Sequence, residues 1–190
     1  MSAPIDDTRF AVVDVETSGL SLRRHHVLQV GVVVVTGTGQ VIDRYSSLLA
    51  PRRRWFYRVG PTRIHGITRG RLRTAPPAGE VLAALGERLR GAQFVAHNAQ
   101  FDVAFLRKAA RRAGVELTIG TPLCTLRLSR RLDPQRQHSH RLGELCRRYG
   151  VELVHPHDAL ADADATAAML PHLLAAAGVT SVDQLASIGA

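Results

Sequence analysis

The N-terminal part of the chain contains three apolar stretches whose pattern predicts three consecutive strands. Residues 10–16 are apolar except at Asp14 and Glu16, and a Ser-Gly turn signal follows them. Residues 27–36 are apolar enough for a central strand, and a Gly-Thr-Gly turn separates them from residues 40–49. We expect these three segments to form an antiparallel meander.

After residue 50 the pattern changes to helical periodicity. Residues 50–77 predict a loop rich in Pro and Arg, and residues 78–90 place apolar side chains at the spacing of an amphipathic helix. Residues 93–96 predict a short buried strand, and Asn98 can cap a helix that follows it and ends near Gly114. Further helices are predicted at residues 122–132, 142–149 and 158–177, with a last turn or two at 181–188. This order predicts a mixed sheet with helices on both faces.

Three separate segments carry side chains suited to a shared acidic site. Side chains alternate along a strand, so Asp14 and Glu16 share one face. Asp102 falls in the first turn of the helix that follows residues 93–96. His157 and Asp162 are five residues apart and do not stack on one helical face. We therefore expect His157 in the lead-in to the last major helix and Asp162 on its second turn.

Carboxylates gathered from distant segments repel one another unless a cation lies between them. Cleavage of a phosphodiester needs charge neutralisation on the attacking and the leaving oxygen, which two divalent cations about 3.5–4 Å apart provide. Hard cations of this kind prefer oxygen ligands. Each segment alone also fits an ordinary strand end or helix start, but together the residue types indicate hydrolysis of nucleic acid.

Composition and charge also favour a polyanionic partner. The chain has 190 residues, of which 45% are hydrophobic, and a formal net charge of +9. Lys108 is the only lysine, so a coding bias explains the choice of Arg but not the excess of cations over 16 acidic residues. The length suits one domain over residues 1–190, with a core at about 8–178 and a short helical tail at 179–190.

No segment indicates secretion or a membrane partner. The N-terminus is polar and acidic, and the longest apolar run, at residues 30–35, is far shorter than the about 20 residues that span a bilayer. Cys124 and Cys146 do not form a Cys-x-x-Cys pair, so neither a disulfide framework nor a zinc knuckle is indicated. We therefore expect a cytoplasmic protein.

In order and spacing, the three segments resemble the DEDDh branch of the 3′→5′ exonucleases, the superfamily of proofreading ε subunits and ribonuclease T. The motifs are Asp-x-Glu-Thr at 14–17, His-Asn-x-x-Phe-Asp at 97–102 and His-Asp-x-x-x-Asp at 157–162. The likeness extends to residues 64–68 and 124–132 and covers nearly the whole chain. It implies a ribonuclease H-like α/β fold with a mixed five-stranded sheet, in which parallel strands are added to three antiparallel ones.

The resemblance also implies the roles of the acidic residues and the histidine. Two Mg²⁺ or Mn²⁺ ions would be held by Asp14, Glu16, Asp102 and Asp162. His157 would be the general base for the attacking water, and the products would be nucleoside 5′-monophosphates released from a 3′ end. His155 is an alternative base, but its spacing to Asp162 does not fit the family motif.

A second implication of the resemblance is a pocket for the terminal nucleotide. Thr17, Gly19 and Leu20 would shape it, with backbone groups at the 3′-hydroxyl and Leu20 against the base. His65 and Phe101 would flank the nucleotide, and ordinary packing is the alternative for both. The chain departs from the commonest family pattern at Ser18 and Gln29. The resemblance implies a metal-ligand role for neither residue.

Several alternatives remain open at this stage. Single-stranded or frayed DNA ends are the favoured substrate, and RNA is the alternative because one contact to a 2′-hydroxyl can decide between them. A binding module without catalysis is disfavoured because all five catalytic positions are filled. Only 12 residues follow Gly178, which favours a free-standing repair or turnover enzyme over a proofreading subunit bound to a DNA polymerase. Residues 52–58, Arg-Arg-Arg-Trp-Phe-Tyr-Arg, combine cations and aromatic residues in one loop. Such a loop can bind a single strand, or its aromatic residues can pack onto the core while the arginines are solvated.

Overall fold

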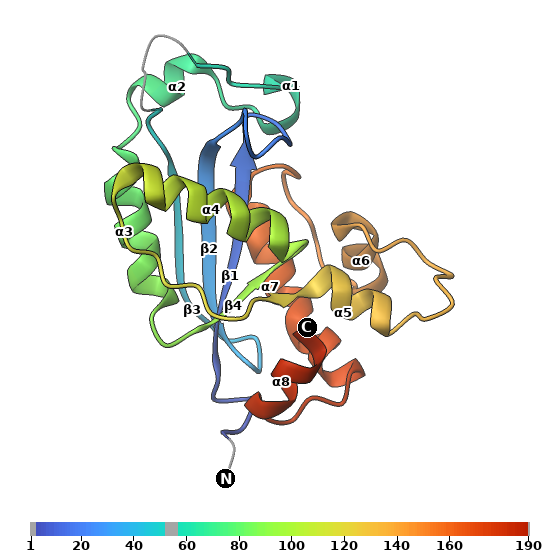
Figure 1. Cartoon of the computed structure of the whole chain (residues 1–190). Coiled ribbons are helices and arrows are strands. Elements are labelled where there is room, and N and C mark those ends of the chain that lie inside the picture. Colours follow the sequence, from blue (N-terminus) through green and yellow to red (C-terminus); the bar gives the residue numbers. More distant parts are fainter. Residues whose placement is uncertain (1–2, 52–56, 190) are drawn as a thin grey trace.

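A computed structural model describes residues 3–51 and 57–189 and contains one mixed sheet with the strand order β3-β2-β1-β4-β5 (Figure 1). The strands are β1 (Arg9–Thr17), β2 (Val27–Thr36), β3 (Val41–Leu48), β4 (Gln93–Ala96) and β5 (Leu123–Cys124). The first three pair antiparallel, and β4 and β5 add in parallel beyond β1. The predicted α/β fold, with its antiparallel meander and parallel additions, is confirmed.

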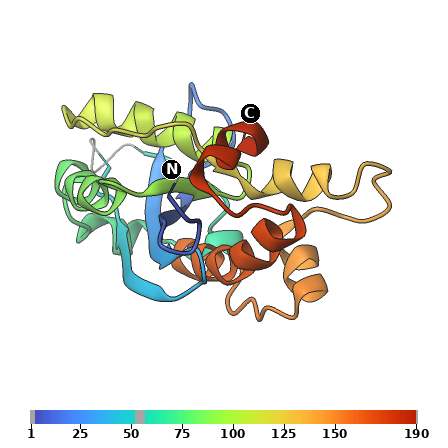
Figure 2. The same ribbon diagram turned by 90° about the horizontal axis from the view of Figure 1, so that it is seen from below.

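Helices cover both faces of this sheet, as Figure 2 shows from below. They are α1 (Thr62–His65), α2 (Arg69–Arg73), α3 (Ala78–Leu89), α4 (Ala99–Ala113), α5 (Thr125–Arg131), α6 (Leu142–Tyr149), α7 (Ala159–Ala176) and α8 (Val182–Gly189). Val13 and Val15 of β1 pack into the core shared with α3 and α4. Phe10 and Val12, on the opposite face, pack against α7 and α8. The odd positions of β1 therefore face α4, and the even positions face α7.

One expected helix start is wrong, one expected loop contains short helices, and one expected cap is not formed. The helix expected from residue 122 begins at Thr125, because residues 123–124 pair with β4 as an edge strand too short for a sequence pattern. The expected loop at residues 50–77 contains the short helices α1 and α2. Asn98 is the N-cap residue of α4, but it adopts a left-handed conformation and its side chain makes no capping hydrogen bond.

No helix of the described segments is long and apolar enough to cross a membrane. The Arg and aromatic residues at 52–56 lie outside the described residues, so the hypothesis for that loop stays a prediction.

Candidate active site

The acidic residues of the three segments converge at the C-terminal end of β1. Asp14 and Glu16 lie on the face of β1 that α7 covers, as the alternation predicted. Ligand atoms of Glu16, His157 and Asp162 lie within 4.8 Å of one another. Asp102 joins from the other side of β1, where its Oδ1 accepts a hydrogen bond from the backbone N–H of Val15 at 3.2 Å. Residues far apart in the chain thus form one cluster.

A glycine in β2 allows α7 to reach this cluster. Gly31 pairs with Asp14 in the β1–β2 register. A Cβ at Gly31 would lie 2.3 Å from the backbone of Ala159, the first residue of α7. Only glycine therefore permits this close approach, which places the start of α7, and with it Asp162, over the carboxylates of β1.

The carboxylates raise one another's proton affinity. Burial, and then the charges of Asp102, Asp162 and Glu16, raise the pKa of Asp14 well above its usual value. Burial, together with the charges of Asp162 and Asp158, raises the pKa of Glu16 to about 8. Burial also raises the pKa values of Asp102 and Asp162. Without a cation this cluster is held at an electrostatic cost.

The donor set of the cluster fits hard divalent cations. Apart from His157 its members are carboxylates, which supply the oxygen ligands that Mg²⁺ and Mn²⁺ prefer. Oδ1 of Asp162 is buried and has no hydrogen-bond partner among the described residues. A buried carboxylate oxygen without a partner, close to other carboxylates, is suited to bind a cation.

His157 lies in the lead-in to α7, as the third motif predicted, whereas Asp162 lies in the first turn of α7 and not in the second, because the helix begins at Ala159. His157 donates its backbone N–H to Oδ2 of Asp162 at 3.3 Å. Its φ of 68° is in the left-handed region, which is costly for a residue with a side chain and is typical of functional sites. His155 also has a positive φ, of 54°, but it lies in a different pocket, with Arg44 and Tyr149, and outside the carboxylate cluster.

Asp158 is a member of this region to which sequence reasoning assigned no role. Its Oδ1 caps α7 by accepting from the N–H groups of Leu160 and Ala161, at 3.0 and 3.2 Å. Its Oδ2 accepts from Nε2 of Gln29 at 3.0 Å. Gln29, which departs from the acidic family pattern, thus holds the start of α7 on the sheet and adds no further negative charge. The position of Asp158 as a helix start was a signal for the cap.

The segment after β1 is held by internal contacts. Oγ1 of Thr17 donates to the carbonyl of Gly19 at 3.0 Å, and a Cβ at Gly19, whose φ is 147°, would lie 2.7 Å from the ring of His25. Nζ of Lys108, the only lysine, donates to the carbonyls of Leu22 and His25 from α4. The segment is therefore tied at both ends of its turn.

Leu20 is 84% exposed at the tip of this segment. A large apolar side chain in that position is available to pack against a ligand. Phe101 is half-buried and lies 4.7 Å from Phe105 between ring centroids, so part of its ring packs within the protein.

His65 is buried, and both ring nitrogens have partners within the protein. Its Nδ1 accepts from the N–H of Ile67 at 3.0 Å, and its Nε2 lies 3.2 Å from the carbonyl of Val59. Burial lowers the pKa of His65, in keeping with a neutral ring that donates from Nε2. These contacts favour the packing alternative for its ring nitrogens and leave only the ring surface for a substrate.

Solved structures with a similar fold are nucleases. Exonuclease X in complex with 5′ overhanging duplex DNA is 26% identical, with a TM-score of 0.73, and the match covers 96% of this chain and 99% of that one. Exonuclease I of E. coli in complex with a dT13 oligonucleotide is 20% identical, with a TM-score of 0.74, and the match covers 88% and 41% of the two chains. The fold and the acidic cluster define a nuclease of ribonuclease H-like architecture.

The family comparison is more specific. The family model described as "Exonuclease" (RNase_T) matches residues 11–170. DNA polymerase III PolC-type of Bacillus cereus is 35% identical over 165 residues, and that of Bacillus subtilis is 33% identical over 171 residues. These matches cover 87% and 90% of this chain but only 11% and 12% of the relatives, so the chain spans about a tenth of their length. The chain belongs to this exonuclease family.

Proposed function

We propose that the chain hydrolyses the terminal phosphodiester of single-stranded or frayed DNA 3′ ends and releases nucleoside 5′-monophosphates. The observation that carries the proposal is the convergence of three distant segments on one acidic cluster with His157 at its edge. The similarity to segments of DNA polymerases supports DNA over RNA as the substrate. In this proposal residues 1–190 form one exonuclease domain, which acts in the cytoplasm.

The proposed cofactors are two divalent cations, Mg²⁺ or Mn²⁺. The residues that would hold them are Asp14, Glu16, Asp102 and Asp162. The all-oxygen carboxylate set and the unpartnered Oδ1 of Asp162 support this assignment. When bound, such cations neutralise charge on the attacking and leaving oxygens.

His157 acts as the general base in this mechanism. It takes a proton from the attacking water through a ring nitrogen, the role that an imidazole commonly has in catalysis. The left-handed backbone at His157 and its N–H bond to Asp162 hold the ring beside the carboxylates. On the other side of the cluster, Thr17 and Gly19 shape the site of the 3′-terminal nucleoside, while Leu20 and Phe101 pack against its base and His65 contributes its ring surface.

A second candidate is proofreading together with a DNA polymerase. The match to a segment of each PolC-type polymerase favours it, because that segment lies within a DNA polymerase chain. In that case the substrate is a mismatched primer end, and the chemistry at the carboxylates is unchanged.

Digestion of matched DNA and RNA oligonucleotides with Mg²⁺, with Mn²⁺ and with EDTA tests the proposal. We expect 5′-monophosphates to be released stepwise from the 3′ end of DNA, and no release in EDTA. Internal cuts, 5′→3′ degradation or undiminished activity in EDTA would contradict it. A preference for RNA would keep the chemistry and overturn the substrate assignment.

A further inference from the structure

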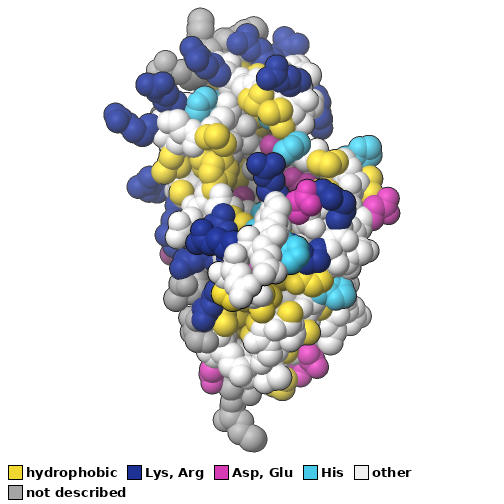
Figure 3. Space-filling model, turned by 90° about the vertical axis from the view of Figure 1, so that its right-hand side faces the viewer, with side chains coloured by type: hydrophobic (Ala, Val, Ile, Leu, Met, Phe, Trp, Pro, Cys, Tyr) yellow, Lys and Arg dark blue, Asp and Glu magenta, His cyan; other side chains and the backbone are white. Residues whose placement is uncertain are grey.

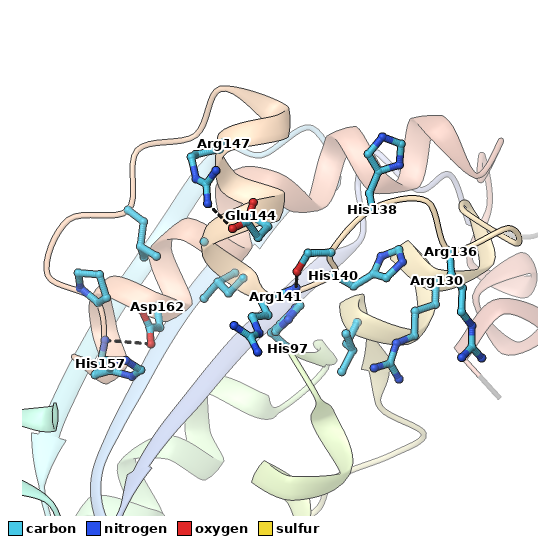
Figure 4. A pocket seen from close by; sticks show the side chains of 16 residues that line it. His97, Arg130, Arg136, His138, His140, Arg141, Glu144, Arg147, His157 and Asp162 are labelled. Carbon is cyan, nitrogen blue, oxygen red and sulfur yellow. Dashed lines mark hydrogen bonds and ion pairs between the residues drawn. The ribbon is translucent and has the colours of Figure 1, made fainter.

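A basic cleft of about 840 Å³ opens beside the carboxylate cluster (Figure 4). We call it the arginine cleft and define it by Arg130, Arg136, His140, Arg141 and Arg147, which line it together with His157 and Asp162 of the active site. These five residues come from α5, α6 and the segment that joins them. The cleft is therefore continuous with the reaction centre but is built from another part of the chain.

The cations of the arginine cleft are mostly free of acidic partners. Arg147 pairs with Glu144, whereas the structure gives Arg130, Arg136 and Arg141 no ion pair among the described residues. The nearby Asp133 accepts the backbone N–H groups of residues 137 and 138, at 3.1 and 2.9 Å, so its carboxylate is used in folding the loop. Neighbouring cations without counter-charges favour a polyanionic ligand.

His140 also lines the cleft, but its ring is enclosed by the protein. Its side chain is only 8% exposed, and neither ring nitrogen has a hydrogen-bond partner among the described residues. Nε2 lies 3.5 Å from Oδ2 of Asp133. The ring is therefore enclosed beside Asp133 in the wall of the cleft, and the arginines supply the charge that faces the open space.

The loop around these residues is held in place. Arg136 has a φ of 52°, a left-handed conformation that the surrounding contacts must maintain. Nδ1 of His97, which follows β4, lies 3.0 Å from Oγ1 of Thr125 at the start of α5. This contact holds the start of α5 at the C-terminal end of β4, which runs parallel to β1 and ends on the same side of the sheet as the carboxylates.

The arginine cleft extends away from the carboxylates, and this direction indicates which part of a nucleic-acid strand it would contact. Figure 4 shows Arg141, Arg130 and Arg136 in a row that leads away from His157 and Asp162. In Figure 1 the segment after β1 lies at the top, whereas α5 and α6 lie to the right. The residues proposed for the terminal nucleotide, Leu20 among them, do not line this cleft. A strand whose last nucleotide lies against Leu20 needs a separate path for its preceding nucleotides, and the row of arginines offers one.

We propose that the arginine cleft binds the backbone phosphates of the substrate strand on the 5′ side of the scissile bond. The inference rests on the proposed function and deepens it. Phosphate contacts position a strand without reading its bases, so the cleft sets how many nucleotides the enzyme holds and not which ones.

The experiment compares two variants that lose the same charge. Arg136→Gln/Arg141→Gln removes two cations of the cleft. Arg9→Gln/Arg111→Gln removes two exposed cations at the start of β1 and in the last turn of α4, outside the cleft. The substrates are the p-nitrophenyl ester of thymidine 5′-monophosphate, a dinucleotide without a 5′ phosphate, and a pentanucleotide. The first two have no phosphate beyond the scissile one.

We expect the cleft variant to match wild type on the ester and the dinucleotide and to lose about tenfold in kcat/KM on the pentanucleotide. The control variant should show a much smaller loss that does not depend on substrate length. An equal loss on all three substrates would overturn the proposal, because the arginines would then act on the reacting group or the fold. The proposal would also be overturned if kcat/KM depended on substrate length equally in wild type and in the cleft variant.

Binding gives a readout that does not need turnover. Each phosphate contact to a single strand contributes about 0.7 to the slope of log affinity against log salt, so the cleft variant should lose about 1.4 from that slope. Fluorescence anisotropy with a labelled decanucleotide in EDTA measures it. The same change is expected for DNA and RNA, and a change for one alone, or only with partly duplex strands, would overturn the proposal. The wild type could be inactive and still show a steeper dependence of affinity on salt than the cleft variant. That result would refute the proposed function and leave the phosphate-binding role of the cleft standing.

Discussion

Two clusters of like charge lie side by side in this protein, the carboxylates at the end of β1 and the arginine cleft between α5 and α6. The carboxylates come from three distant segments, and burial raises their pKa values. The arginines come from one continuous stretch and are exposed. Figure 3 shows, on the right-hand face of Figure 1, Lys and Arg side chains around a few acidic and histidine side chains.

The difference between the clusters follows from dielectric screening. Exposed charges interact weakly through water, so neighbouring arginines can remain without partners until a strand arrives. Buried carboxylates cannot, and they need either protons or cations. The carboxylate cluster should therefore respond strongly to small chemical changes, and the arginine cleft should respond weakly.

The largest effect is expected from removing one carboxylate. Asp162→Asn, and likewise Asp14→Asn, should reduce turnover at least about 10³-fold, because a proposed metal ligand is lost while the fold remains. Asp164→Asn, on the same helix, breaks only the surface ion pair of Asp164 with Arg44 and is the matched control. Steady-state hydrolysis of an oligonucleotide measures all three. Near-wild-type turnover by Asp14→Asn would show that the carboxylate cluster is not the catalytic metal site.

The next effect concerns His157, which lies at the border of the two clusters. His157→Ala should lower kcat by about 10²–10⁴ while the strand still binds, because a general base acts on water and is not needed to hold phosphates. His155→Ala changes the other left-handed histidine of the same loop and should be nearly silent. Single-turnover rates and anisotropy separate the two effects. Exchanged phenotypes would show that the third motif has another register.

The increase in Tm that divalent cations cause in a thermal melt should depend on the carboxylate cluster and not on the arginine cleft. At a hundredfold excess over Kd they stabilise the folded state by about 2.7 kcal/mol, which corresponds to an increase in Tm of about 5–10 °C for a domain of this size. Monovalent salt at equal ionic strength should not reproduce the increase. Asp14→Asn should melt higher than wild type in EDTA and respond less to Mn²⁺, whereas Arg136→Gln/Arg141→Gln should respond as wild type does. Equal shifts in all proteins would place the cations elsewhere.

A pH series in EDTA gives a further test of the carboxylate cluster. The folded-state pKa of Glu16 is raised from 4.5 to about 8, so between these values the folded protein binds more protons than the unfolded chain. Stability should therefore fall as the pH rises through this range, and saturating Mg²⁺ should abolish the fall. Denaturant unfolding at several pH values measures the trend. A free energy of unfolding that rises with pH over this range in EDTA would contradict the proposed repulsion between the carboxylates.

The smallest effect is expected for the stability of the cleft variant. Exposed charges contribute little, so Arg136→Gln/Arg141→Gln should change the free energy of unfolding by less than about 0.5 kcal/mol. Urea unfolding tests this expectation. A large loss would mean that the arginines have a structural role, and the contrast between the clusters would then fail.

Local sequence patterns determined most of the secondary structure and the candidates for the site. The period of two along β1 placed Asp14 and Glu16 on one face, and the helical periodicities located α3, α4, α6 and α7. These features depend on neighbouring residues only, which is why they can be read without a structure. The order of the three motifs identified the family.

Tertiary structure alone decided how the segments meet. Nothing local predicts that Gly31 admits the backbone of Ala159, that Gln29 binds Asp158, or that Lys108 reaches the carbonyls of the segment after β1. The edge strand β5 likewise exists only because β4 offers it a partner. Long-range packing brings together residues that are far apart in the sequence, and it places the carboxylates beside the arginine cleft.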